Sequence, residues 1–246
     1  MRFKVFLIVL AMAVAVGTAA PAGAQSQSDE WQFQIAPLYL WAISIDGTMD
    51  IRGRIEQDFR VDFSDAFDNL EGAFTVHFEA GKGRWGLLAD MTYLNIAGSQ
   101  DIPTPGRSAD IDVKTLILEG AGGYSFAENW WVIAGVRYFK LDTDIGFQLD
   151  IAPEINVGES WADLFAGVLW RPKLGERWTF SGRFDIGAGG SDLVWNAHAI
   201  IDYRLGKWAA ILFGYRHLDY DYTNQNAGIV YDASMSGPLF AFRFFW

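Results

Sequence analysis

Cysteine is absent from the 246-residue sequence, which excludes a disulfide framework and a lipid-modified N-terminal cysteine. Basic residues are few, since 19 Lys and Arg stand against 30 Asp and Glu and give a net charge of −11. Nucleic-acid binding needs clustered Lys and Arg to neutralise phosphates, so we expect no nucleic-acid partner. After residue 24, no apolar run approaches the ~20 residues that a helix needs to cross a bilayer.

The first 24 residues have the pattern of an export signal. Arg2 and Lys4 precede an apolar run from Val5 to Val16, and small residues follow up to Ala22-Gly23-Ala24. A basic start, a short apolar stretch and an A-x-A site together predict a cleaved secretory signal peptide over residues 1–24. Residues 25–246 are then the mature chain, which we expect to fold as one domain.

The remaining chain is rich in apolar and aromatic residues although it lacks helical spans. Aromatic residues make up 16% of the sequence, with 11 Trp, and the hydrophobic share is 51%. Only helices and closed β-barrels satisfy every backbone hydrogen bond in lipid. The composition therefore predicts an all-β fold, a single antiparallel transmembrane β-barrel.

Alternation of apolar and polar residues supports strands with one face toward lipid. In residues 177–189, Trp178, Phe180, Phe184 and Ile186 share one face, and Arg177, Thr179, Ser181, Arg183 and Asp185 share the other. Residues 72–80 and 192–204 alternate in the same way. In residues 31–45 the same reasoning predicts that Tyr39, Trp41 and Ile43 face outward with Trp31, Phe33 and Ile35.

Short polar links that end in Trp are expected to mark one rim of the barrel. Trp favours the membrane interface, where its ring is half buried and its N–H stays hydrated. Links on the periplasmic side are short, and the outer links at about 46–70, 98–109, 143–158 and 222–229 are longer. Counting strands between links gives about ten, with eight or twelve as alternatives. The expected aromatic girdle is Trp31, Trp85, Trp130, Trp178, Trp208 and Trp246.

The chain ends in Phe240-Ala241-Phe242-Arg243-Phe244-Phe245-Trp246, with aromatics at alternate positions back from the terminal Trp. This tail resembles the C-terminal signature of bacterial outer-membrane β-barrels, and the chain is similar in scale to the small OmpA/OmpW-like barrels. The resemblance implies an outer-membrane location, contact with membrane lipid and lipopolysaccharide, and recognition of the tail by the barrel-insertion machinery.

Strand parity places a mixed set of ionisable residues in the lumen. Two interpretations fit them: a packed polar core in which opposite charges pair across strands, which we favour, or the lining of a small-solute pore. The predicted lumen residues are Glu71, His77, Glu79, Asp90, Glu119, Arg137, Asp163, Arg171, Arg183, Asp185, His198, Asp202, Arg204, Arg216 and Arg243.

An enzyme is the less favoured alternative. A His beside a carboxylate is the requirement for general-base catalysis, and His77 with Glu79 and His198 with Asp202 meet it in sequence. Outer-membrane lipid-A deacylases and omptin proteases place His with an acid near the outer rim, where His217 and Asp219 lie. Parity turns these two side chains outward, so we predict no catalytic residue.

Pairs of aspartates recur where outer strand ends are expected: Asp110/Asp112, Asp142/Asp144 and Asp219/Asp221. Residues two apart on a strand project to the same side, so each pair is a weak candidate for Ca²⁺ or Mg²⁺. We favour a solvated acidic rim, and expect no metal and no other cofactor.

The long outer link at 46–70 carries a possible short helix. Ser64 is a candidate cap, with Phe67 and Leu70 on one side and Asp65 and Asp68 on the other. Such a segment either folds into the mouth as a constriction, which we favour slightly, or extends the barrel. The sequence thus predicts an outer-membrane barrel with a structural or small-solute pore role. A rim enzyme and a surface-interaction barrel are the alternatives.

Overall fold

The computed structural model describes residues 30–51, 55–101, 108–147, 155–225 and 228–246. The predicted signal peptide at 1–24 lies outside these residues. Strands dominate the fold, with one short helix, α2 (Phe63–Asp68). The strands are β1 (Gln32–Pro37), β2 (Leu40–Trp41), β3 (Ser44–Ile51), β4 (Ile55–Val61), β5 (Leu70–Lys82), β6 (Trp85–Asp101), β7 (Ser108–Ala127), β8 (Trp130–Phe147), β9 (Ile155–Trp170), β10 (Trp178–Gly189), β11 (Leu193–Arg204), β12 (Ala209–Asn224) and β13 (Ile229–Phe245).

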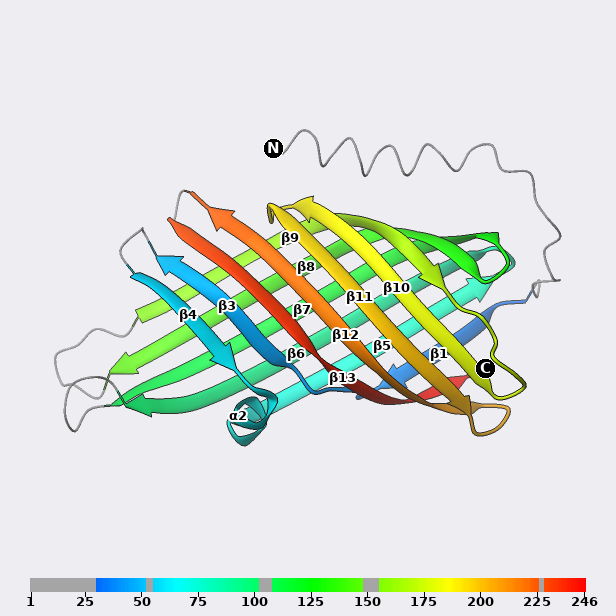
Figure 1. Ribbon diagram of the computed structural model, residues 1–246, viewed down its shortest axis with the longest axis horizontal. Coiled ribbons are helices and arrows are strands. Elements are labelled where there is room, and N and C mark those ends of the chain that lie inside the picture. The colour runs from blue at the N-terminus through cyan, green and yellow to red at the C-terminus, as the bar shows by residue number, and fades with distance from the viewer. Residues whose placement is uncertain (1–29, 52–54, 102–107, 148–154, 226–227) are drawn as a thin grey trace.

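The strands form a closed antiparallel barrel of ten strands with three extra strand segments, which confirms the predicted fold class and number (Figure 1). Each strand from β5 to β13 pairs with its neighbour in sequence. Closure comes from the N-terminal segment, because β1 pairs with β5 on one edge while β1, β2 and β3 pair in turn with β13 on the other. No helix among the described residues is long and apolar enough to span a membrane.

Side chains alternate between a buried interior and an exposed wall along most strands. On β13, Ala233 and Met235 are buried inside the barrel while Phe240 and Phe242 are exposed. Large exposed apolar residues of this kind recur on the outward face of most strands, which is the arrangement of a wall in contact with hydrocarbon.

The N-terminal segment departs from simple alternation. Tyr39, Trp41 and Ile43 are buried inside the barrel, so the prediction that they face lipid was wrong. The reason is a break between β1 and β2 at Leu38, whose φ of 56° lies in the left-handed region. Ala36 before the break is also buried, so the inward-facing residues have even numbers before Leu38 and odd numbers after it.

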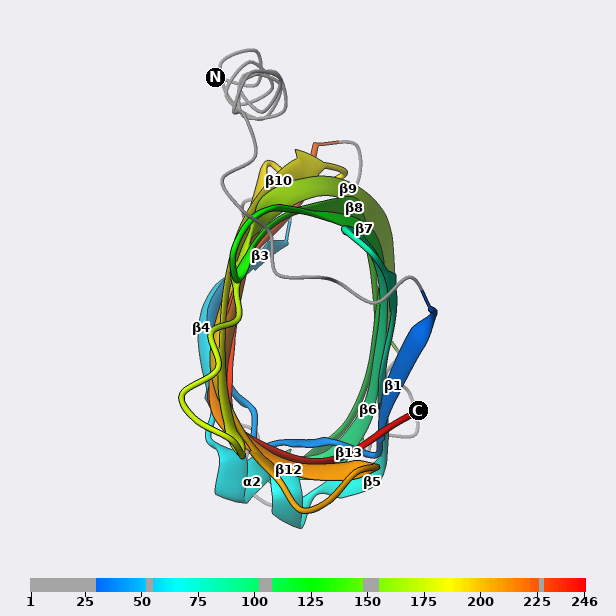
Figure 2. The same ribbon diagram turned by 90° about the vertical axis from the view of Figure 1, so that its right-hand side faces the viewer.

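The segment at 46–70 extends the barrel wall. Strand β3 pairs with β13 from Ser44 to Ile51 and turns back as β4, which pairs with β3. Figure 2 shows α2 beside the wall and not across the bore, so the favoured constriction was wrong. The residue before the helix is Asp62, and Ser44 on β3 caps the helix start by accepting a hydrogen bond from the Phe63 N–H at 3.1 Å.

The other outer links are shorter than predicted because the hairpins continue as strands. Strand β6 runs to Asp101, β8 to Phe147 and β12 to Asn224. Strand β7 has 20 residues and β8 has 18, whereas ~9–11 residues suffice to cross the membrane. The barrel therefore projects beyond the bilayer at the end away from the short turns.

At the short-turn end, the six predicted girdle tryptophans are all exposed. Three of them begin a strand directly: Trp85, Trp130 and Trp178. Their rings contact neighbouring aromatics on the wall, as in the Trp130–Trp170 stack with centroids 5.7 Å apart. Half-exposed indoles at one level are the arrangement expected at a membrane interface.

Candidate functional site: the barrel interior

The interior contains three successive zones. An aromatic layer of Phe139, Trp161, Tyr220, Tyr222 and Tyr231 occupies the outer half. An ion-paired layer built around Arg137, Arg183 and Arg216 lies below it, and a cavity that we call the vestibule opens at the short-turn end.

The centre of the ion-paired layer is a quartet of two arginines and two acids. Arg137 on β8 donates to Glu119 on β7 through Nε at 3.0 Å and Nη2 at 2.7 Å, and to Asp185 on β10 at 2.8 Å. Arg183 completes the quartet, with 2.7 Å contacts to both acids. The Arg137, Glu119 and Asp185 side chains are at most 1% exposed. The quartet is electrically neutral, which is what allows four charges to be buried together.

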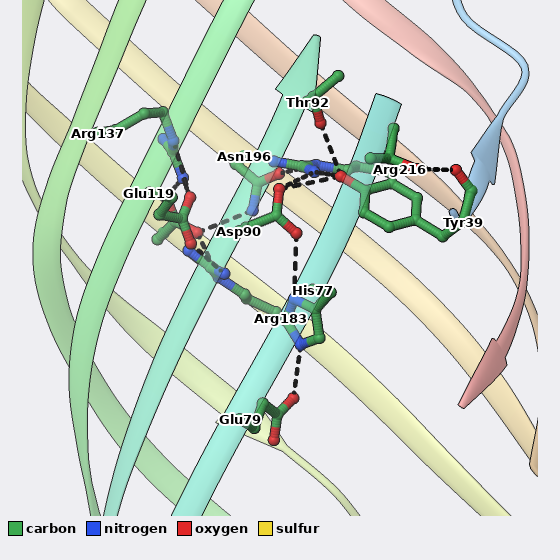
Figure 3. Close-up of polar contacts among 12 residues, drawn as sticks. Tyr39, His77, Glu79, Asp90, Thr92, Glu119, Arg137, Arg183, Asn196 and Arg216 are labelled. Carbon is green, nitrogen blue, oxygen red and sulfur yellow. Dashed lines mark hydrogen bonds and ion pairs between the residues drawn. The ribbon is translucent and has the colours of Figure 1, made fainter. Parts of the chain in front are cut away.

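Asn196 connects this quartet to a second cluster around Arg216 and Asp90 (Figure 3). Its amide donates to Asp185 at 2.8 Å, and its oxygen accepts from Arg216 Nε at 3.0 Å. Arg216 also lies 3.5 Å from Asp90 and 4.7 Å above the Trp41 ring.

Tyr39 anchors the second cluster from the N-terminal segment. Its hydroxyl is 2.9 Å from Asp90 Oδ1 and 2.7 Å from the Thr92 hydroxyl. Tyr39, Thr92 and Asn196 belong to the site although the sequence analysis did not place them there. Asn196 and Thr92 had the inward parity that would have revealed them, whereas Tyr39 was hidden by the break at Leu38.

His77 sits between two carboxylates. Its Nδ1 is 3.1 Å from Asp90 and its Nε2 is 2.9 Å from Glu79. Arg171 donates two hydrogen bonds, of 2.8 and 2.9 Å, to the Glu79 carboxylate. An ionised carboxylate only accepts hydrogen bonds, so both ring nitrogens must donate to satisfy this geometry. His77 is thus held between two carboxylates that also contact Arg171 and Arg216.

The other predicted lumen residues are distributed below and above these clusters. Arg243 lies 3.2 Å from Asp202, and Arg204 stacks on Phe245 at 4.8 Å. His198 faces a small cavity of about 50 Å³ beneath the ion-paired layer. Asp163 is buried and accepts a hydrogen bond from the Ser191 N–H at 2.8 Å.

Glu71 differs from the expectation. A β-bulge between Leu70 and Gly72 displaces it, so it is exposed and accepts a hydrogen bond from Asn95 at 3.1 Å. The extra residue of a bulge has no partner opposite it, and simple parity fails there.

The aromatic layer packs rings from several strands together in the outer half. Trp161 stacks on Tyr222 with centroids 3.9 Å apart and on Phe139 at 4.5 Å. Tyr220 packs against Phe139 at 4.8 Å, and Tyr222 donates to Glu159 at 2.6 Å. These rings come from β8, β9, β12 and β13, so the layer joins opposite walls.

Comparisons with known proteins show the fold alone. No family model matches, and none of the curated proteins matches the chain. Among solved structures, the outer membrane protease OmpT from Escherichia coli has a TM-score of 0.52 at 10% identity, covering 91% of this chain and 99% of OmpT.

Two further solved structures are outer-membrane β-barrels. The translocator domain of autotransporter NalP from Neisseria meningitidis has a TM-score of 0.45 at 11% identity, with 98% and 94% coverage of this chain and of that one. Ail, the attachment invasion locus protein of Yersinia pestis, has a TM-score of 0.43 at 8% identity, with 90% and 100% coverage. The three proteins have different roles, and OmpT, with a TM-score of 0.52, shows the β-barrel fold that it shares with this chain.

The predicted outer-rim residues His217 and Asp219 point away from the lumen. His217 Nε2 is 3.9 Å from Asp219, and the His217 ring packs against Trp195 at 4.4 Å on the outer wall. Their neighbours Arg216, Leu218 and Tyr220 are the buried, inward residues of β12.

Three of the six paired aspartates contact lysines. Lys114 lies 3.0 Å from Asp112 and 3.8 Å from Asp144, and Lys140 lies 2.5 Å from Asp142. Asp221 is exposed, and the side chain of Asp110 lies outside the described part. Within the described ranges, no group of three or more His, Asp or Glu residues is arranged to hold a metal ion.

Proposed function

We propose that this protein is a closed, non-conducting β-barrel of the bacterial outer membrane with a structural role. The observation that carries the proposal is the ion-paired layer, in which the neutral Arg137–Glu119–Asp185–Arg183 quartet is connected through Asn196 to Arg216 and Asp90 with almost no exposed surface. A pore that selects solutes by charge needs its charged groups in contact with water.

The aromatic layer supports the same conclusion. Passage of a solute would require opening two barriers of different chemistry in series. One is a set of stacked rings and the other is a set of paired charges. Disrupting either barrier costs several kcal/mol, because stacked rings lose packing and paired charges lose their partners.

Planar-bilayer recording tests this proposal. Folded, purified protein reconstituted in a neutral lipid should give no stable single-channel conductance in symmetric salt. An open porin reconstituted in the same lipid provides the positive control. Discrete conductance steps that recur at one size would contradict the closed barrel and restore the pore interpretation.

The C-terminal residue supports a proposed contact with the barrel-insertion machinery. Trp246 pairs with Phe33 through two backbone hydrogen bonds of 2.9 and 3.1 Å, and their rings lie 5.8 Å apart. The terminal residue therefore closes the seam between the first and last strands. We propose that the machinery recognises this edge before closure, when the strand still has free backbone donors and acceptors.

A further inference from the structure

The vestibule at the short-turn end has a charge opposite to that of the whole chain. It has a volume of about 710 Å³, and at its inner end Glu79, Arg171 and Arg243 also line the smaller cavity beneath the ion-paired layer. Its lining contains eight cationic side chains against three acidic ones, Glu79, Glu128 and Asp202, in a chain whose net charge is −11. The cations are Lys82, Arg84, Arg171, Lys173, Arg177, Arg204, Lys207 and Arg243.

Of the three acidic side chains, only Glu128 is left at the entrance, where it offsets one of six cations. Glu79 pairs with Arg171, and Asp202 lies beside Arg243, so both are engaged at the inner end. The six cations nearer the entrance form no ion pair with a carboxylate within the described part of the chain. Their field is concentrated by the low-dielectric walls of the cavity, which attracts anions.

Two arginine N–H groups at the inner end of the vestibule have no hydrogen-bond acceptor among the described residues. The Nε atoms of Arg171 and Arg243 are buried and have no hydrogen-bond partner in the described structure. A buried N–H without an acceptor is unfavourable, so an oxyanion that reaches the inner end would supply an interaction that the protein itself lacks.

One wall of the vestibule is apolar. Trp131 lies flat against β6 and β7, where Gly86 and Gly123 leave room for it: a Cβ at Gly86 would lie 3.3 Å from the indole ring. Ile133 and Leu169 continue this surface, and the cations Arg177, Arg204 and Lys207 come from the segments around β10 to β12. A ligand that fits both surfaces has an anionic group and a flat apolar body.

We propose that the vestibule binds amphiphilic anions from the periplasmic side, with sulfonate, phosphate or carboxylate groups toward the arginines and an aromatic or aliphatic body against Trp131. This binding role is separate from the closed-barrel proposal, since the vestibule ends below the sealing layers.

The test uses pyrenetetrasulfonate, a water-soluble aromatic tetra-anion, titrated against the folded protein in uncharged detergent at low salt. Fluorescence anisotropy should show saturable binding. The Lys173→Gln/Lys207→Gln double variant should weaken this binding about tenfold, because each partly screened charge contributes a few-fold. Its matched control is Lys114→Gln/Lys140→Gln, which removes two cations near the opposite end and should change the affinity less than twofold.

A third variant tests the apolar wall. Trp131→Leu should weaken the binding of pyrenetetrasulfonate while leaving competition by inorganic pyrophosphate unchanged, because pyrophosphate has no apolar body. Absence of saturable binding, or equal losses in the two lysine variants, would overturn the proposal.

The source of the anion is settled by repeating the titration in nanodiscs. If phosphatidylglycerol in place of phosphatidylcholine blocks the probe, a lipid headgroup supplies the anion. If probe binding persists in both lipids, the site takes a soluble ligand. Either result leaves the anion site in place.

Discussion

Arg137→Met is the substitution expected to damage the barrel most. Arg137 makes three hydrogen bonds to Glu119 and Asp185 and lies 4.7 Å over the Phe165 ring. Removing one partner of a buried ion pair costs about 3–5 kcal/mol. Arg183 still contacts both acids at 2.7 Å, which reduces the loss, so we expect about 3 kcal/mol.

Neutralising an acid as well should restore much of this loss. In Arg137→Met/Glu119→Gln, Arg183 and Asp185 remain as a neutral pair, so the double variant should be more stable than Arg137→Met alone. The assay is urea unfolding of the barrel refolded into liposomes, followed by Trp fluorescence and by the mobility difference between folded and unfolded protein on cold SDS gels.

Lys140→Met is the control for that experiment. It removes a cation from the same strand, where Lys140 is partly exposed and pairs with Asp142, so it should cost less than about 1 kcal/mol. If Arg137→Met costs no more than Lys140→Met, the quartet does not act as a buried charge cluster and the reasoning fails.

Three further changes test other parts of the fold by the same unfolding assay. Trp161→Ala should cost about 3–5 kcal/mol because it empties the centre of the aromatic layer, and a loss under about 1 kcal/mol would mean that the stacking is loose. Gly135→Ala should cost about 1–3 kcal/mol, because its Cβ would lie 2.2 Å from the Gly120 carbonyl oxygen. The control Gly122→Ala should be neutral, because its Cβ meets no atom within 4 Å. Equal losses of stability in the two variants would refute the close approach at Gly135. Asn129 has a φ of 62° in the turn after β7, so Asn129→Ala should cost about 1 kcal/mol and Asn129→Gly little.

A prediction of a different kind concerns assembly. Trp246→Ala should slow the appearance of folded protein in the outer membrane, measured by pulse labelling and cold SDS gels. Unchanged assembly kinetics would argue against recognition of the terminal residue.

Much of the barrel could be predicted from period-two alternation, because a strand between lipid and a packed interior must change polarity at every residue. This reasoning identified most of the buried charges, including Arg137, Asp185 and Arg216. It also identified the tryptophans that begin strands after short turns. Where the backbone is regular, the alternation alone predicts whether each side chain faces lipid or the barrel interior.

The errors come from places where the backbone breaks the period. One residue in the left-handed region at Leu38 reverses the facing of Tyr39 and Trp41, and a single bulged residue turns Glu71 away from the lumen. Neither feature has a local sequence signal, since a Leu rarely adopts positive φ. The aromatic layer was missed for another reason: the sequence analysis made no prediction for Trp161 or Tyr220, and composition does not distinguish rings that face inward from rings that face lipid.

The connections inside the ion-paired layer link residues far apart in sequence, as in the contact between Tyr39 and Arg216, which are separated by 177 positions. The β7–β8 hairpin can pair Arg137 with Glu119, but no single hairpin can pair Arg216 on β12 with Asp90 on β6. An unpaired arginine at the middle of a bilayer costs about 2–4 kcal/mol, so inserting the hairpins one after another would leave Arg216 without Asp90 and Tyr39 in the membrane. We therefore expect the sheet to curl and bring its two ends together while it enters the membrane, so that Arg216 contacts Asp90 before it contacts lipid.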